Sequence, residues 1–241
     1  MYVNAGRLFK NALEIARGTP SNNPAVQTAR DALTSILFAA MSVETFINEL
    51  HHMTHNGMPT ASTNLKVLGD LLEEAERSRS SVAAKYQFAK FILSGQAFDK
   101  GASPYQDFSL LLDLRNLIVH AKPLEAKMQK DSSGRVSWVE PKIMVRLQSM
   151  GLLEITDFQR ENTPDTEMLI SDLIAEISTQ RIATWACESA AAIITDILDA
   201  VPAEFAPLTD VFYRRDFTLA QIPQEIQPSP SAAGPREKGS A

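Results

Sequence analysis

Residues 110–122 read LLLDLRNLIVHAK, a segment in which apolar residues recur every three or four positions. Successive side chains on a helix are turned by about 100° around its axis, so this spacing separates an apolar arc from a polar one. We therefore expect a helix whose apolar arc packs on the core of the domain. The apolar arc comprises Leu110, Leu111, Leu114, Leu117, Ile118 and Ala121, and the polar arc comprises Asp113, Arg115, Asn116 and His120.

Two apolar residues, Leu112 and Val119, lie between Arg115 and Asn116 on the otherwise polar arc. A face that mixes charged and aliphatic side chains is expected to be covered by a second surface, most simply another copy of the same helix. Asn116 and His120 are four residues apart and are therefore neighbours on the helix. We expect the amide of Asn116 to hold the imidazole in one orientation.

Helical spacing of apolar residues continues through most of the chain and predicts a mostly α-helical protein. The longest predicted helix runs from Pro24 to about His55 and is stopped by Asn56 and Gly57. Pro104 is well placed as the first residue of the helix that reaches Ala121, since its missing N–H costs nothing there. The other predicted helices cover residues 1–18, 64–79, 80–94 and 163–200, the last with Thr163 or Thr166 as its cap.

The pattern changes between residues 123 and 157. A turn cluster at 131–134 is flanked by strand-like runs at 135–139 and 142–147. A small β-hairpin or three-stranded meander is therefore expected as an insertion over about 124–157. Residues 223–241 contain four prolines and should form a disordered tail. Residues 1–222 are predicted to form one domain.

Composition favours a soluble protein of a reducing compartment. Of the 241 residues 44% are hydrophobic, enough for an ordinary core, and Cys187 is the single cysteine, so no intramolecular disulfide can form. The segment Met1–Gly18 carries charges and lacks the apolar run of a signal peptide. No apolar stretch approaches the ~20 residues that a membrane span needs, so we expect a cytoplasmic protein without a membrane segment.

The formal net charge of −6 disfavours binding to nucleic acid, because phosphate contacts normally need a basic surface. This objection would weaken if several cations shared one face of the molecule. The cations in question are Lys85, Lys90, Lys100, Arg115, Lys122 and Lys127.

Arg115 is followed directly by the polar Asn116, and four residues separate Arg115 from His120. This arrangement resembles the Arg, polar residue, spacer, His signature of HEPN ribonucleases. The segment AAMSVETFINEL at 39–50 resembles the first core helix of many prokaryotic HEPN proteins. The resemblance extends over roughly residues 25–200. It implies a HEPN-like helical bundle that pairs through its motif helices and cleaves RNA without a metal ion or other cofactor.

The resemblance implies a role for each motif residue. His120 would be the general acid or base, Arg115 would stabilise the phosphate and the transition state, and Asn116 would orient the histidine. One chain offers one motif histidine, so a homodimer through the helix at 110–122 would bring two His120 and two Arg115 into one cleft. Lys122 would contact the substrate. Three further residues would contact the motif side chains without touching the substrate: Glu44, Asn48 and Asp113.

The physiological role implied is that of a toxin or phage-defence effector, with a cognate antitoxin or regulatory protein as its partner. One alternative is a non-catalytic HEPN-like module for dimerisation or protein interaction, which the acidic net charge favours. The simplest structural interpretation of the two residues, without a HEPN motif, is that Arg115 pairs with Asp113 or another acidic residue at the surface and His120 caps or lines the bundle. A third alternative is a metal-binding bundle that uses His51, His55 and Glu44.

Overall fold

The computed structural model describes residues 4–18, 24–56, 63–120, 127–130, 136–139, 142–153, 170–203 and 205–217. The prediction of a mostly α-helical protein is confirmed. In chain order the helices are α1 (Ala5–Ala16), α2 (Pro24–Asn56), α3 (Thr63–Arg77), α4 (Val82–Ser94), α5 (Tyr105–His120), α6 (Lys142–Ser149), α7 (Ile170–Ile177), α8 (Gln180–Asp199), α9 (Ala206–Thr209) and the π-helical turn η1 (Asp210–Arg214).

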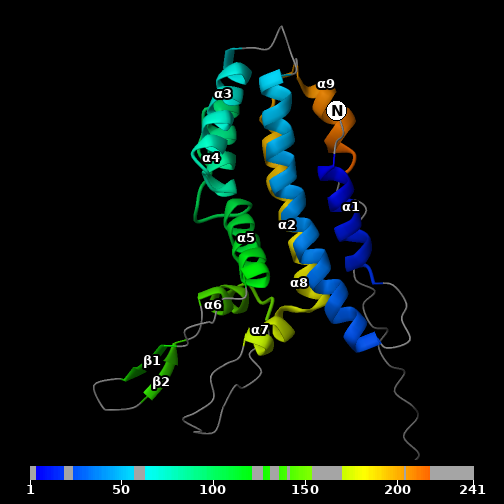
Figure 1. Ribbon diagram of the computed structural model, residues 1–241, viewed down its shortest axis with the longest axis vertical. Helices are drawn as coiled ribbons and strands as arrows, with labels where there is room; N and C mark the ends of the chain where they lie inside the picture. The colour runs from blue at the N-terminus through cyan, green and yellow to red at the C-terminus, as the bar shows by residue number, and fades with distance from the viewer. Residues whose placement is uncertain are drawn as a thin grey trace, which may run out of the picture.

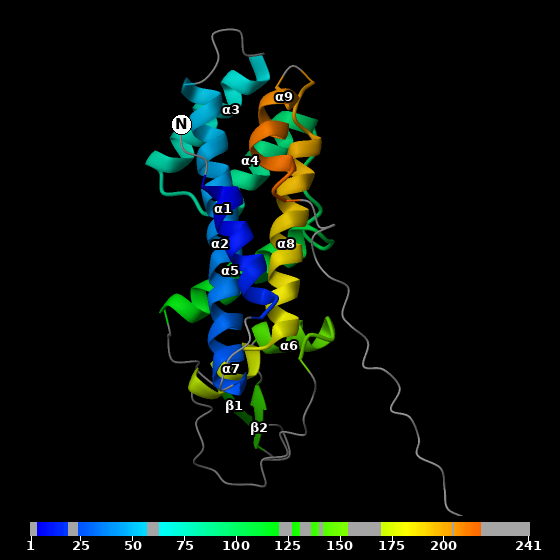
Figure 2. The ribbon, with the colours of Figure 1, turned by 90° about the vertical axis from the view of Figure 1, so that its right-hand side faces the viewer.

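Helix α2 is the axis of the bundle and contacts α1, α3, α4, α5 and α8. In the view of Figure 1, α3, α4 and α5 lie on one side of α2 and α1 lies on the other. Helix α8 runs beside α2 along the length of the molecule, as the turned view also shows (Figure 2). A single long helix therefore offers each shorter helix a surface to pack against.

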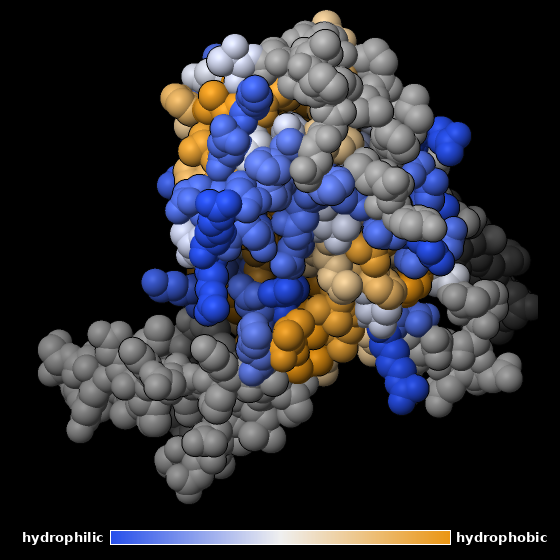
Figure 3. Space-filling model, turned by 45° about the horizontal axis from the view of Figure 1, so that its top comes forward, coloured by the Kyte–Doolittle hydropathy of each residue, from blue (hydrophilic) through white to orange (hydrophobic). Residues whose placement is uncertain are grey.

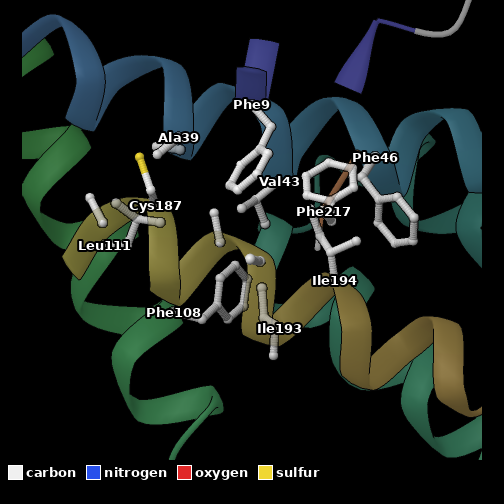
Figure 4. Close-up of a cluster of buried hydrophobic side chains, with 14 of the residues drawn as sticks. Phe9, Ala39, Val43, Phe46, Phe108, Leu111, Cys187, Ile193, Ile194 and Phe217 are labelled. Atoms are coloured by element: carbon white, nitrogen blue, oxygen red, sulfur yellow. The ribbon is translucent and has the colours of Figure 1, made fainter. Parts of the chain in front are cut away.

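The core is built by the apolar arcs that the spacing predicts. Phe46 of α2 meets the ring of Tyr213 edge-on at 5.1 Å between centroids, and Tyr86 of α4 lies 4.7 Å from Phe108 of α5. Figure 4 shows side chains of α1, α2, α5, α8 and the C-terminal segment meeting in this cluster. Cys187 is fully buried within it, and burial raises the pKa of its thiol to about 11.

The segment Ala29–His55 is the one part of the described chain that is long and apolar enough to cross a membrane. The core helix of a soluble protein passes the same test, and α2 buries Ile36, Val43, Phe46 and Leu50 completely. A soluble protein agrees with this packing, and the cytoplasmic location stays a prediction.

The predicted β-rich insertion over 124–157 is not supported in that form. Residues 142–147, predicted as a strand, belong to helix α6, which buries Met144 and Leu147 at helical spacing. The six residues 142–147 include the β-branched Ile143 and Val145 and therefore resembled a strand, but the buried positions, Met144 and Leu147, are three apart. Elsewhere in that range the described residues include β1 (Lys127–Lys130) and β2 (Val136–Val139), whose backbones pair antiparallel.

The single helix predicted over 163–200 is interrupted. Helix α7 ends at Ile177, and the side chain of Thr179 accepts the backbone N–H of Ile182 at 3.3 Å as the N-cap of α8. Such a cap begins a new helix because it satisfies an amide that has no partner within the helix. The predicted caps Thr163 and Thr166 and the predicted tail at 223–241 lie outside the described residues.

Glu49 of α2 joins both ends of the described chain. Its carboxylate accepts the backbone N–H groups of Asn4 and Ala5 at the start of α1 and the hydroxyl of Tyr213 at 3.0 Å. Burial and the neighbouring carboxylate together raise the pKa of Tyr213. A negative charge at a helix N-terminus is also favourable for the helix dipole, so Glu49 helps to dock α1 and η1 on α2.

We expect Glu49→Ala to lower the free energy of unfolding by about 1–3 kcal/mol, because it leaves two backbone amides and a buried hydroxyl without their acceptor. Urea unfolding followed by circular dichroism measures the change. The matched control is Glu14→Ala on the exposed side of α1, which should stay within about 0.5 kcal/mol of the parent. Equal stability of the two variants would contradict the role assigned to Glu49.

Candidate functional site

Helix α5 presents the motif as its amphipathic spacing predicts. Leu110, Leu111 and Leu114 are fully buried, and Leu117 and Ile118 pack partly buried against the same core. The opposite side of the helix faces solvent at Asn116, Val119 and His120. The packing of the leucine arc therefore fixes which side chains of α5 a ligand or a partner can reach.

Arg115 lies at the border between these two sides and reaches across to α2. Its Nη2 lies 3.1 Å from Oε2 of Glu44, and its Nη1 donates to Oδ1 of Asn116 at 3.0 Å. The Arg115 side chain is 31% exposed and that of Glu44 is 38% exposed. The motif arginine thus already pairs with an acidic residue, as the simplest structural interpretation predicts, and that residue is Glu44.

Asn116 and His120 form no hydrogen bond with each other. Both side chains are exposed, and the Asn116 carbonyl oxygen is taken by Arg115. Within the part of the chain that the structure describes, His120 has no hydrogen bond or ion pair. The orienting contact expected between Asn116 and His120 is therefore not formed within a single chain. His120 is the last residue of α5, where a protonated imidazole would interact favourably with the helix dipole.

Asp113 belongs to a different contact from the one expected. Its Oδ2 lies 3.2 Å from Nη1 of Arg146, whose Nη2 donates to the carbonyl oxygen of Gln106 at 2.9 Å. Burial raises the pKa of Asp113, and the positive charge of Arg146 opposes this rise. Arg146 therefore ties α6 to the polar side of α5. Sequence reasoning missed Arg146 because it assigned residues 142–147 to a strand.

Asn48 supports α4 and, among the described residues, makes no hydrogen bond to α5. Its Oδ1 accepts from Nζ of Lys85 at 3.2 Å, and Lys85 also binds Glu76 of α3. The hydrogen bond from Lys85 lowers the pKa of Glu76. Of the supporting residues expected around the motif, Glu44 reaches Arg115, whereas Asn48 and Asp113 bind other partners. Lys122 lies outside the described residues.

A basic face would have weakened the objection from net charge, but three of the four described cations in question are paired with carboxylates, and Lys100 is exposed. Lys85 binds Glu76, and Nζ of Lys90 lies 2.7 Å from Asp196. Arg115 is neutralised by Glu44, and the side chain of Lys127 is outside the described part of the structure. The described residues therefore give the site one half-exposed cation that is locally balanced by one carboxylate.

The histidines of α2 lie away from the motif, towards the C-terminal end of that helix. Nε2 of His51 lies 3.1 Å from Oε2 of Glu73 without the alignment of a hydrogen bond, and the rings of His51 and His55 are 5.7 Å apart. Glu44 is engaged by Arg115 and is not part of this group. Among the described residues, no three His, Cys, Asp or Glu side chains are placed to hold a metal ion.

Apolar side chains flank the ion pair. Helices α2 and α5 run in opposite directions (Figure 1), so Met41, one turn before Glu44, and Val119, one turn after Arg115, lie on the same side of the ion pair. Met41 is 42% exposed and Val119 is 52% exposed. Figure 3 shows that the face it draws also carries hydrophobic areas beside hydrophilic side chains. The ion pair is therefore bordered by apolar surface that the single chain leaves open.

No protein-family model, curated protein or solved structure matches this chain. The resemblance to HEPN ribonucleases therefore rests on the residues of α2 and α5 themselves.

The His51 group generates a prediction about pH. Burial lowers the pKa of His51 below 6.5, with Glu73 and Glu76 raising it and His55 and Lys85 lowering it. Because the pKa is lower in the folded chain than in the unfolded one, unfolding takes up a proton between the two values. The stability that depends on neutral His51 is present above about pH 6.5 and is lost as the pH falls towards the folded-state pKa.

We therefore expect the free energy of unfolding of His51→Gln to decrease less than that of the parent when the pH is lowered from about 7.5 to about 5. Urea unfolding curves recorded across this range measure the difference between the two proteins. Parallel pH profiles for parent and variant would show that His51 does not contribute in this way.

Proposed function

We propose that the protein is a metal-independent endoribonuclease of the HEPN type that acts as a homodimer through α5. The observation that carries this proposal is the position of three residues on the last turns of one helix that is held by its buried leucines: Asn116 and His120 face solvent, and Arg115 lies at the border of that side. The role of a toxin or phage-defence effector with a cognate inhibitor comes from the resemblance and stays a prediction.

The chemistry matches the residues. In RNA transesterification the 2′-oxygen attacks phosphorus, a base takes the 2′ proton, the bond to the 5′-oxygen breaks and an acid protonates that oxygen. An imidazole titrates near neutral pH and can serve as base or acid, and a guanidinium can bind two phosphate oxygens. One His120 cannot take both positions at once, so two subunits would supply one imidazole each.

Exposed apolar surface beside the site supports the dimer. Val119 and Met41 lie next to the ion pair and are both more than a third exposed, and Leu112 packs partly buried against the core. An isologous interface across a two-fold axis would place the same residues of both subunits against one another. It would also exclude water from Arg115 and so strengthen the attraction between its guanidinium and a bound phosphate.

A second candidate function is a non-catalytic module for dimerisation or protein interaction. The ion pair between Arg115 and Glu44 favours it, because a neutralised guanidinium is a poorer site for phosphate. The formal net charge of −6 points in the same direction. In this case the apolar border around Val119 would serve association alone.

We expect Arg115→Ala and His120→Ala each to reduce cleavage of single-stranded RNA in EDTA by about 10²-fold or more, the loss typical of a missing acid, base or phosphate clamp. Gel electrophoresis of labelled RNA measures the rates. Arg7→Ala and His55→Ala remove the same residue types from exposed positions of α1 and α2 and should leave the rate unchanged. Full activity of both motif variants would remove the nuclease proposal.

We expect Val119→Glu to convert a dimer into a monomer and to abolish cleavage, because two like charges would meet across the two-fold axis in an apolar interface. Light scattering coupled to size-exclusion chromatography measures the mass in solution. Val67→Glu on α3 is the matched control, because Val67 is 41% exposed and remote from α5. A dimer that persists in Val119→Glu, or a parent protein that is monomeric, would contradict pairing through this face.

A further inference from the structure

Both terminal nitrogens of the Arg115 guanidinium already carry a bond within the chain. Nη2 is bonded to the Glu44 carboxylate at 3.1 Å, and Nη1 is bonded to the Asn116 carbonyl oxygen at 3.0 Å. A phosphate is clamped by two parallel N–H groups on one edge of a guanidinium. Each edge of the Arg115 guanidinium that could clamp a phosphate includes a terminal nitrogen that already donates a hydrogen bond to Glu44 or Asn116. An incoming phosphodiester must therefore displace Glu44 or bind beside its negative charge.

We propose that Glu44 is an intramolecular competitor that keeps Arg115 from the phosphodiester of a bound RNA in the resting subunit. The inference rests on the proposed function for the identity of the anion, and it adds a regulation of the same site. Glu44 occupies the guanidinium as a carboxylate, the chemical group closest to a phosphate among the side chains. The resting site is thereby electrically balanced, in agreement with the acidic character of the chain.

The ion pair is suited to exchange because it is only partly buried. Side chains that are about a third exposed exchange their ion pairs with water and other anions at small cost. Glu44 and Arg115 lie on different helices that are fixed by separate buried arcs, so breaking the pair moves two side chains and leaves the packing of α2 and α5 unchanged. A ligand that offers two phosphate oxygens can therefore replace one carboxylate oxygen without unfolding.

Glu44→Gln tests the proposal because glutamine keeps the size of the side chain and its hydrogen-bond acceptor while removing the charge. The probe is a fluorescein-labelled single-stranded RNA with 2′-O-methyl riboses, which cannot be cleaved by transesterification. Fluorescence anisotropy at low ionic strength measures its affinity for the full-length protein. Screening is weak under that condition, so the effect of one charge is largest.

We expect Glu44→Gln to bind this RNA roughly three- to tenfold more tightly than the parent, the effect of one unit charge at about 6 Å in a nearly aqueous dielectric. Glu14→Gln changes the net charge equally on the exposed side of α1 and should bind like the parent. In the Arg115→Ala background the gain from Glu44→Gln should disappear, because no guanidinium is left to release.

Two results would overturn the proposal directly: equal RNA affinities of Glu44→Gln and Glu14→Gln, or an equal gain in RNA affinity from Glu44→Gln with and without Arg115. Weaker RNA binding by Glu44→Gln than by the parent would also overturn it and would make Glu44 a positioning residue for Arg115. The nuclease proposal is judged separately, because the probe is not cleavable. Tighter binding by Glu44→Gln in a protein that cleaves no RNA would support the competitor and remove the nuclease. If the parent cleaves RNA and Glu44→Gln leaves the RNA affinity unchanged, the nuclease proposal would be supported and the competitor proposal removed.

Discussion

The ion pair between Glu44 and Arg115 stands where the packed surfaces of α2 and α5 meet solvent. Both helices bury an apolar arc in the same core, and the two charges close the edge of that contact. This placement follows from the amphipathic spacing, since the first polar residue beside an apolar arc must face either water or a partner of opposite charge. The pair holds the motif arginine in one conformation. Any contact of Arg115 with a ligand or a partner starts from that conformation.

Helix α2 makes further polar contacts with neighbouring helices along its length. Glu44 binds Arg115 of α5, Asn48 binds Lys85 of α4, and His51 lies against Glu73 of α3. These three positions are four and then three residues apart, so they form one polar stripe that meets three helices in turn. The apolar stripe of α2 supplies most of the burial, whereas the polar stripe selects the rotation and height at which each neighbour docks. Removing water from unpaired charges is costly, and a wrong register would leave such charges unpaired.

Local sequence patterns were sufficient to predict the helices α2 and α5 but insufficient to predict which side chains pair between them. The spacing of the leucines in 110–122 and of the apolar residues in 24–55 predicted α5 and α2, because burial on one side of a helix leaves a trace in every turn. The partner of Arg115 lies 71 positions away in the sequence, and no short-range rule selects Glu44 over Asp113. The strand predicted at 142–147 failed for a related reason: a short apolar run fits both periods. The burial of Met144 and Leu147 and the contact of Arg146 with α5 favour the helix. The break at Thr179 is a capping effect, since helical spacing continues on both sides of it.

The geometry of α2 also limits where a second proton-transfer group could come from. A helix rises about 1.5 Å per residue, so His51 and His55 lie about 10 and 16 Å from Glu44 along the axis of α2. That separation exceeds the reach of their side chains to the phosphate that Arg115 would bind, and His51 is already held against Glu73. Within the part of the chain that the structure describes, His120 is thus the one imidazole near Arg115. Under the proposed function, a single subunit would lack either the acid or the base among the described imidazoles, and another copy of α5 would supply it. Without that copy, the same residues leave a balanced ion pair bordered by apolar side chains, which is a surface for association.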